Sequence, residues 1–387
     1  MDRDRQWRSS ARVLWVVAAG VFLTFAVVVG CGNGDDDDSG GQGYRRTNLV
    51  YNVPGVAPVT DPNLLNAWGI AWLPGGPWWV ANNGSGTSTV YDGDGDPFPP
   101  LPAPLVVAIP PPAGSPPGAR GRPTGIVGNT TSDFVITQGA ASGPAAFIFA
   151  TEDGTIAGWN LLVNPTNAVL AVDNHASGAI YKGLAIGSSN GANFIYATNF
   201  HAGTVDVFDA HFQAVHTPGA FVDPDLPAGY APFGIQALGT GAMQAIWVTY
   251  ALQDASGEDD VPGPGNGFVS LFDPAGNFIE RFASRGALDS PWGITQAPAT
   301  FGRFAGKILI GNFGNGRINV FDPSTRRLRG QLNEPNSDTK IEIDGLWGIG
   351  FGNGGLAGSA DVLYFAAGPN DEVDGLFGMI QPVFPQQ

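Results

Sequence analysis

The feature that most constrains this chain is a short motif that recurs six times, at intervals of 51 to 59 residues. In each copy a Gly stands between an aromatic, Thr or Lys residue and an Ile or Leu. A repeat of this length is typical of folds built by stacking one small structural unit. The six copies are Trp68-Gly69-Ile70, Thr124-Gly125-Ile126, Lys182-Gly183-Leu184, Phe233-Gly234-Ile235, Trp292-Gly293-Ile294 and Trp347-Gly348-Ile349.

The residues after each motif have the pattern of β-strands. A β-branched or aromatic run follows, then a polar Gly-rich loop, then another run that often ends in an aromatic residue and Asp. The 57 Gly and 32 Pro residues favour tight turns over long helices. We expect an all-β protein whose second strands lie at 78–81, 146–150, 194–198, 245–250, 307–311 and 362–366, with third strands ending at Asp92, Asp209, Asp273 and Asp322.

Three strands and a weaker fourth, repeated six times, predict a six-bladed β-propeller. The Gly of each motif suits a first strand that crowds the axis, where side chains lack room. The sixth repeat ends near Val383 with three strands, whereas residues 47–53 form a lone strand before the first repeat. We therefore expect this N-terminal strand to complete the last blade, with residues 44–387 forming one propeller. Trp68, Trp292 and Trp347 are expected to fill gaps between blades.

The N-terminal segment has the pattern of an export signal. Arg residues precede an uncharged apolar run from Val13 to Gly30, and residues 28–31 resemble the lipobox of bacterial lipoproteins. We expect residues 1–30 to be a signal peptide, Cys31 to carry a lipid, and residues 31–43, acidic and Gly-rich, to form a flexible tether. The apolar run is also just long enough for an uncleaved transmembrane anchor. Either arrangement predicts an exported protein held at the bacterial cell envelope.

The repeats resemble NHL-type propeller blades. Trp68-Gly69-Ile70 and the segments 151–156, 197–204, 263–267 and 311–314 together resemble a family of exported, uncharacterised bacterial propeller proteins. The likeness extends over about residues 47–383. It implies a fold and a location outside the cytoplasm, and it implies no established activity.

Polar residues follow the second strands and precede the first strands. In a propeller these loops share one face around the mouth of the axial channel, so their carboxylates and amides would converge on one rim. Calcium needs six to eight such oxygens. The alternative is that Asn, Asp and Gly are frequent here because turns favour them. The candidate ligand or metal residues are Asn82, Glu152, Asp153, Asn199, His201, Asp254, Asn312, Asn315, Asp344, Asp371 and Glu372.

Charge narrows the possible partners. The net charge of −16 at pH 7 predicts a surface that repels phosphate backbones, so we expect no nucleic-acid partner. The run Glu258-Asp259-Asp260 lies in the longest rim loop, where a charge run is usually solvated. The four His residues lack metal-ligand spacing, and His201 is the one expected near the mouth, as a possible acid–base residue.

Two functions of different classes fit these features. The first is a non-catalytic module, tethered to the membrane by its lipid, that binds a glycan, a peptide or an envelope protein through its rim. The second is a calcium-dependent hydrolase or lactonase, by analogy with six-bladed calcium enzymes. Its ligands would be Glu152, Asn199, Asn312 and Asp344, and calcium would polarise a carbonyl and activate water. The residues themselves establish neither a cofactor nor an enzymatic activity.

Overall fold

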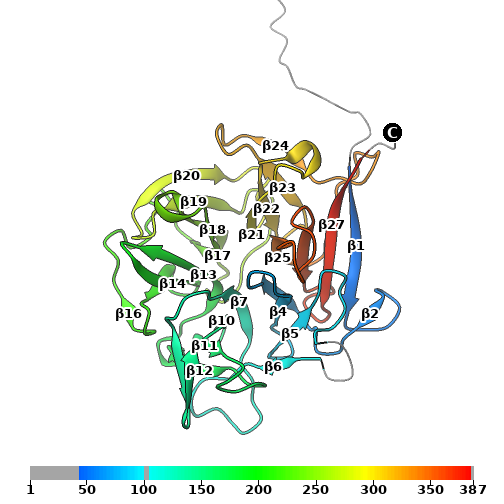
Figure 1. Ribbon diagram of the computed structural model, residues 1–387. Helices are drawn as coiled ribbons and strands as arrows, with labels where there is room; N and C mark the ends of the chain where they lie inside the picture. Colours follow the sequence, from blue (N-terminus) through cyan, green and yellow to red (C-terminus); the bar gives the residue numbers. More distant parts are fainter. Residues whose placement is uncertain (1–42, 100–103, 385–387) are drawn as a thin grey trace, which may run out of the picture. The chain divides into compact units, whose positions relative to one another are not determined.

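The computed structural model describes residues 43–99 and 104–384. Six antiparallel sheets surround a central axis, which is the expected six-bladed all-β propeller (Figure 1). Within the described residues, no helix is long and apolar enough to cross a membrane. The expected signal peptide, Cys31 and most of the tether fall outside these residues.

Each blade is a four-stranded sheet whose first strand lies nearest the axis. The strands of blade one are β3 (Ala67–Ala71), β4 (Trp78–Asn82), β5 (Thr87–Tyr91) and β6 (Val106–Ala108). Those of blade two are β7 (Pro123–Gly128), β10 (Phe147–Thr151), β11 (Thr155–Trp159) and β12 (Val169–Asp173). Those of blade three are β13 (Tyr181–Ser189), β14 (Ala192–Asn199), β15 (Thr204–Phe208) and β16 (Ala214–Val215).

The other three blades repeat this order. The strands of blade four are β17 (Tyr230–Leu238), β18 (Ala245–Leu252), β19 (Phe268–Phe272) and β20 (Phe278–Ser284). Those of blade five are β21 (Pro291–Gln296), β22 (Ile308–Asn312), β23 (Ile318–Phe321) and β24 (Leu328–Gln331). Those of blade six are β25 (Leu346–Phe351), β26 (Leu363–Ala367), β27 (Leu376–Val383) and β1 (Gly43–Tyr51).

The N-terminal strand closes the last blade, as predicted. β1 pairs antiparallel with β27 from Gly43↔Val383 to Tyr51↔Leu376, so it covers the outer edge of β27. Two elements were not expected. A short strand, β2 (Val59–Thr60), adds to β1 in parallel, and a hairpin of β8 (Val135–Gln138) and β9 (Ala141–Pro144) is inserted in blade two. The described part of the chain also has three short 3-10 turns in loops, at η1 (His175–Ser177), η2 (Gly241–Met243) and η3 (Gly302–Phe304).

The six motif glycines bring neighbouring blades into backbone contact. A Cβ added to Gly69 would lie 2.5 Å from the Thr124 carbonyl oxygen of blade two, which is too close for any real side chain. Each of the other motif glycines likewise faces the backbone of the next blade. Gly348 of blade six faces blade one, where an added Cβ would lie 2.6 Å from the Trp68 carbonyl oxygen. The expectation that the motif Gly marks crowding at the axis is confirmed, because Gly alone lacks the Cβ.

A bulge accompanies each of these glycines. The pairing between first and second strands shifts register across the motif in every blade, for example between Ala67 and Ile70 and between Leu346 and Ile349. Bulges bend a strand and re-aim its side chains. The residue before each Gly can therefore turn toward the axis, while the Ile or Leu after it packs between blades.

The Asp that ends a third strand organises the next turn. In blade one the Asp92 carboxylate accepts the backbone N–H groups of Asp94 and Asp96 at 3.0 and 2.9 Å. Asp209, Asp273 and Asp322 act in the same way in blades three, four and five. The predicted turn role is confirmed at all four positions.

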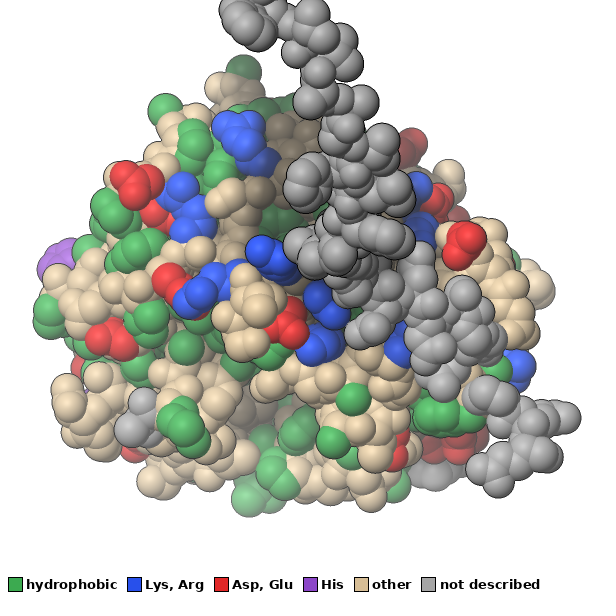
Figure 2. Space-filling model, turned by 90° about the horizontal axis from the view of Figure 1, so that it is seen from above, with side chains coloured by type: hydrophobic (Ala, Val, Ile, Leu, Met, Phe, Trp, Pro, Cys, Tyr) green, Lys and Arg blue, Asp and Glu red, His purple; other side chains and the backbone are tan. Residues whose placement is uncertain are grey.

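The charges are unevenly distributed despite the strong negative total. Most Lys and Arg residues that follow Gly43 lie between Arg281 and Lys340. Figure 2 views the molecule from the side where β20 and β24 lie, and basic side chains gather on that flank. Acidic residues are left in excess on the loops that follow the second strands, at one mouth of the channel.

We predict that Gly293→Ala destabilises the propeller. A Cβ there would lie 2.6 Å from the Trp347 oxygen and 2.9 Å from an Ile349 methylene, so two inner strands must separate. Overpacking of this kind costs about 1–3 kcal/mol or more. Gly143→Ala, in the β8–β9 hairpin, is the control, because its φ is not left-handed and the closest contact of its Cβ would be the Asn160 side-chain amide, at 3.2 Å. Thermal unfolding should show a clearly lower Tm for Gly293→Ala, and equal losses in the two variants would contradict the close approach.

Candidate functional site

Aromatic side chains from four blades meet on the axis and close one end of the channel. Trp68 and Trp347 stack with ring centroids 3.6 Å apart, and Trp292 packs edge-on against both. Phe233 packs against Trp347 with ring centroids 5.7 Å apart. The expectation that the Trp residues fill gaps between blades is wrong, because the bulge at each motif turns them to the axis. We call Trp68, Phe233, Trp292 and Trp347 the aromatic plug.

Lys182 occupies the same position in blade three and is the one charged residue among the six. Its side chain is 3% exposed, and its ammonium lies over the Trp68 ring, 5.4 Å from the centroid. Trp292 donates its indole N–H to the Lys182 carbonyl oxygen at 2.9 Å, which links blades five and three. The aromatic plug therefore fixes the backbone of Lys182 and surrounds the base of its side chain.

Two carboxylates hold the Lys182 ammonium. Its Nζ lies 2.5 Å from Glu152 Oε1, contributed by the loop after β10, and 2.9 Å from Asp259 Oδ1, contributed by blade four. Burial alone would lower the pKa of Lys182, but the charges of Glu152 and Asp259 raise it above its ordinary value. Burial alone would raise the pKa of Glu152, but Lys182 lowers it. Both groups are therefore charged at neutral pH, as a buried pair should be.

Neighbouring groups complete the environment of Glu152. Its Oε2 accepts a hydrogen bond from the Asn83 amide at 2.9 Å and lies 3.8 Å from the Arg122 guanidinium. Arg122 also pairs with Asp153 at 3.2 Å. Glu152 and Asp153, both candidates from the sequence, thus lie together at the mouth with protein cations as their partners.

The longest rim loop delivers two further carboxylates. Residues 253–260 form a hairpin-like extension of blade four that begins and ends at the bridge between Gln253 and Asp260. Asp254 accepts the Ser256 hydroxyl and the Glu258 backbone N–H, so this candidate shapes the loop. Asp259 lies over Lys182 with its side chain 75% exposed. Burial raises the pKa of Asp260 to about 6.

A strained turn of blade six brings Glu372 toward the same cluster. Asn370, Asp371 and Glu372 all have left-handed backbone, with φ of 59°, 51° and 64°. Such a run costs about 1 kcal/mol or more per non-Gly residue, and strain of this kind concentrates at functional sites. Asp344 supports the turn by accepting the Asn370 N–H at 2.8 Å. Burial, followed by the charge of Glu152, raises the pKa of Glu372 to about 7.

The remaining candidates, apart from His201, are engaged in their own blades. The Asn82 amide donates to Thr87 and Thr89, and the Asn199 amide donates to Asp206. The Asn312 amide donates to the Ala287 carbonyl oxygen and to Asn315. His201 is exposed beside the 253–260 extension, and its carbonyl oxygen accepts from Gln253. The structure therefore brings together Glu152, Asp153 and Glu372 and leaves these five in separate turns.

The arrangement around Lys182 fits an organic ammonium better than calcium. Both Glu152 oxygens are taken by protein donors, and the Lys182 ammonium stands where a shared ion would stand. In the part of the chain that the structure describes, no group of three or more His, Cys, Asp or Glu is arranged to hold a metal ion. The indole N–H groups of Trp68 and Trp347 and one oxygen of Asp260 are buried there without a hydrogen-bond partner among the described residues.

Sequence reasoning missed the central residue of this site. Lys182 was recognised as a motif residue but not as a functional one, and Asp259 was expected to be a solvated loop charge. The signal was present: Lys182 alone is charged among six positions that otherwise carry Trp, Phe or Thr. A charge at a position that faces a crowded axis must find counter-charges.

Sequence comparison gives relatives without a stated activity. The chain is 32% identical over 344 residues to uncharacterized protein R648 of Acanthamoeba polyphaga mimivirus, which covers 87% of this chain and 80% of that protein. It is 31% identical over 346 residues to uncharacterized protein L690 of the same virus, covering 87% and 85%. The chain belongs to the family of these mimivirus proteins. No model of a described protein family matches it.

Solved structures agree on the fold. A protein of unknown function from Bacteroides thetaiotaomicron superposes with a TM-score of 0.52 at 9% identity, covering 88% of this chain and 76% of that one. Virginiamycin B lyase from Staphylococcus aureus superposes with a TM-score of 0.44 at 15% identity, covering 88% and 99%. The likeness to the Bacteroides protein concerns the fold alone, and neither structure carries an activity over to this chain.

We predict that Glu372→Gln stabilises the protein at pH 8 but not at pH 4.5. The native pKa of Glu372 is raised to about 7. The native state therefore holds a proton that the unfolded chain releases at lower pH, so stability falls as pH rises toward 7. Removing the acid should recover up to about 3 kcal/mol above pH 7.

Melting curves of wild type, Glu372→Gln and the control Glu334→Gln across this pH range measure the effect. Glu334 is an exposed residue of blade five, away from the mouth. A Glu372→Gln variant whose Tm tracks that of wild type at every pH would contradict the crowding of carboxylates at the mouth.

Proposed function

We propose that this protein is a non-catalytic binding module that holds a basic peptide segment against the acidic mouth of its propeller. One observation carries the proposal. Glu152, Asp153, Asp259, Asp260 and Glu372 gather at the mouth, where Lys182 and Arg122 supply the positive charges. The carboxylates outnumber these cations, and a ligand's ammonium or guanidinium groups would balance the excess.

The state of the individual carboxylates supports a positively charged ligand. Glu152 is fully engaged by Lys182 and Asn83, but the Asp259 side chain remains 75% exposed. Burial raises the pKa of Glu372 to about 7, and the charges of Glu152, Asp259 and Asp260 add to this rise, so further negative charge is unfavourable here. A bound cation would lower that pKa and favour ionised Glu372, so binding should strengthen as pH rises through 7.

The aromatic plug supports binding at the surface over passage along the axis. Trp68 and Trp347 are each 1% exposed, so a ligand at this mouth rests on the loops and does not enter the channel. A peptide segment can lie across such a rim and place successive basic side chains over carboxylates of different blades. A single small cation would contact fewer of these carboxylates.

A labelled pentalysine peptide tests the proposal at pH 8 and low ionic strength, where Glu372 is ionised. We expect saturable binding by fluorescence anisotropy that Glu372→Gln weakens roughly three- to tenfold. Asp338→Asn, the same loss of charge on an exposed loop of blade five, should leave the affinity unchanged.

Two results would contradict the proposal. Equal weakening in both variants would show attraction to net charge without a site. Full displacement of the peptide by millimolar calcium at constant ionic strength would assign the mouth to a metal ion, as the calcium-dependent hydrolase or lactonase requires.

The proposal includes export and anchoring through Cys31. Its support lies in the sequence, where Arg residues and the apolar run 13–30 lead directly to Val28-Val29-Gly30-Cys31. The two mimivirus relatives neither name a location nor come from bacteria. Expression of the full chain in a bacterium with an alkyne-labelled fatty acid should label wild type and leave Cys31→Ser unlabelled. Equal labelling of the two would contradict anchoring at this residue.

A further inference from the structure

The channel has a second mouth whose chemistry is opposite to that of the first. It lies at the far ends of the first strands, beyond the motif Ile residues, and encloses a cavity of about 300 Å³. Side chains from all six blades line it, and among the described residues none of them is charged. In a chain of net charge −16, an uncharged mouth stands apart from the surrounding surface.

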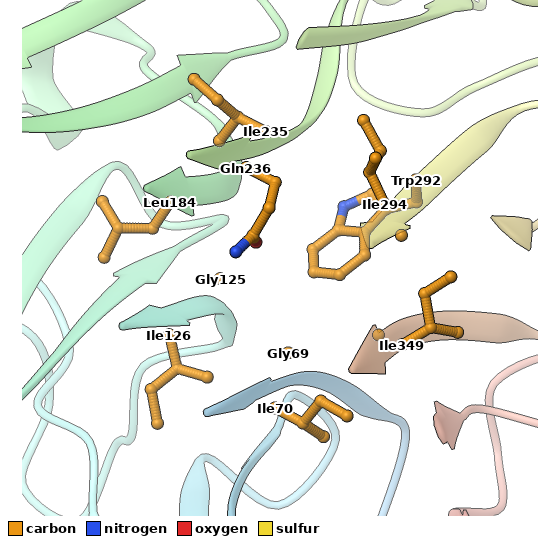
Figure 3. A pocket seen from close by; sticks show the side chains of 12 residues that line it. Gly69, Ile70, Gly125, Ile126, Leu184, Ile235, Gln236, Trp292, Ile294 and Ile349 are labelled. Atoms are coloured by element: carbon orange, nitrogen blue, oxygen red, sulfur yellow. The ribbon is translucent and has the colours of Figure 1, made fainter. Parts of the chain in front are cut away.

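The cavity does not continue through the protein. Between the two mouths the channel narrows to a small space of about 30 Å³, enough for one or two water molecules. The Trp292 ring of the aromatic plug lines this space. Figure 3 shows the motif Ile side chains turned outward between the blades, with the centre left open. A molecule in the second mouth is therefore separated from the Lys182 cluster.

One side chain gives this mouth a specific polar group. The residue after the motif Ile or Leu is Ala71, Val127, Ala185, Thr295 or Gly350 in five blades, but in blade four it is Gln236. The Gln236 amide extends from β17 into the centre of the channel (Figure 3). It makes no hydrogen bond to another residue in the part of the chain described here, so both its donor and its acceptor are free for a ligand.

The walls combine apolar side chains with uncharged polar groups. Trp72 and Phe351 flank the opening, and the Trp72 indole N–H is already satisfied by the Phe351 carbonyl oxygen at 2.9 Å. Gln244, on another side, accepts the Ser188 backbone N–H at 2.9 Å. The Trp72 indole N–H and the Gln244 oxygen are thus occupied by protein partners. Ligand sites commonly combine apolar walls with a few directed polar groups in a volume of about 300 Å³ or more.

We infer that the second mouth is a binding site for an uncharged small molecule that carries a hydrogen-bonding group for Gln236. A charged ligand would lose its hydration without meeting a counter-charge. An uncharged molecule with a carbonyl, amide or hydroxyl group would fill the cavity and pair with the free amide, while its apolar part lies on Trp72 and Phe351. This site is independent of the acidic mouth and of the peptide proposed to bind there.

The uncharged dye Prodan, a naphthalene with a ketone oxygen, is the probe. We expect one molecule to bind per chain with a blue-shifted emission and with energy transfer from tryptophan, since Trp72 and Trp78 line the site. Gln236→Glu places a charge in the cavity and should weaken binding at least tenfold. Gln236→Leu removes the hydrogen bond while keeping the size, and should weaken it roughly fivefold.

Two controls locate the effect. Gln138→Glu, on the outer strand β8, and Asp338→Asn, on an exposed loop of blade five, should both bind Prodan as wild type does. The anionic dye 1-anilinonaphthalene-8-sulfonate should not compete with Prodan.

Gln236 is exposed at the channel, so its variants should melt as wild type does. Absence of saturable Prodan binding would overturn the inference. Wild-type affinity in both Gln236 variants would also overturn it.

Discussion

The structure depends on how closely six inner strands can approach one another around an axis. At each motif a Gly faces the backbone of the next blade, and in blades one, five and six an added Cβ would lie 2.5–2.6 Å from a neighbouring carbonyl oxygen. Without these glycines the blades could not meet, and the gap would have to be filled by side chains or water. The bulge that accompanies each Gly then decides where the flanking residues point.

This constraint produces two mouths with different chemistry from one repeated motif. The residue before Gly turns to the axis on one side, where Trp68, Phe233, Trp292 and Trp347 form the plug and Lys182 carries a charge into it. The residues after the motif line the other side and carry no charge. The plug separates the two, so that one face can hold a charged partner and the other an uncharged molecule.

The repeats made much of the fold predictable from the sequence. Gly spacing and the short β-branched runs predicted six blades, and the second strands lie within one or two residues of their expected bounds. The closing role of the N-terminal strand followed from two observations: a lone strand precedes the first repeat, and the sixth repeat has three strands. β1 begins at Gly43, earlier than the expected start at residue 47. Apolar and polar residues alternate only weakly along the β8–β9 hairpin, so the sequence did not predict it.

The candidate site was harder to predict because it depends on orientation. Asn82, Asn199 and Asn312 occupy equivalent ends of second strands, and each satisfies a turn within its own blade, as the composition of turns alone would suggest. Glu152 differs because Lys182 and Asn83 hold its carboxylate at the mouth, and Glu372 differs because it stands in the left-handed turn of 370–372. No residue pattern signals that turn, because Asn, Asp and Glu rarely adopt it in succession.

The central claim is that the Lys182 ammonium is the resident cation of the acidic mouth. A crystal structure of residues 43–387, grown at pH 8 in millimolar calcium, tests it most directly. The account predicts Lys182 Nζ between Glu152 and Asp259, as found here at 2.5 and 2.9 Å, with no ion between the two carboxylates. A calcium ion bound to Glu152 with Lys182 displaced from it would contradict the account.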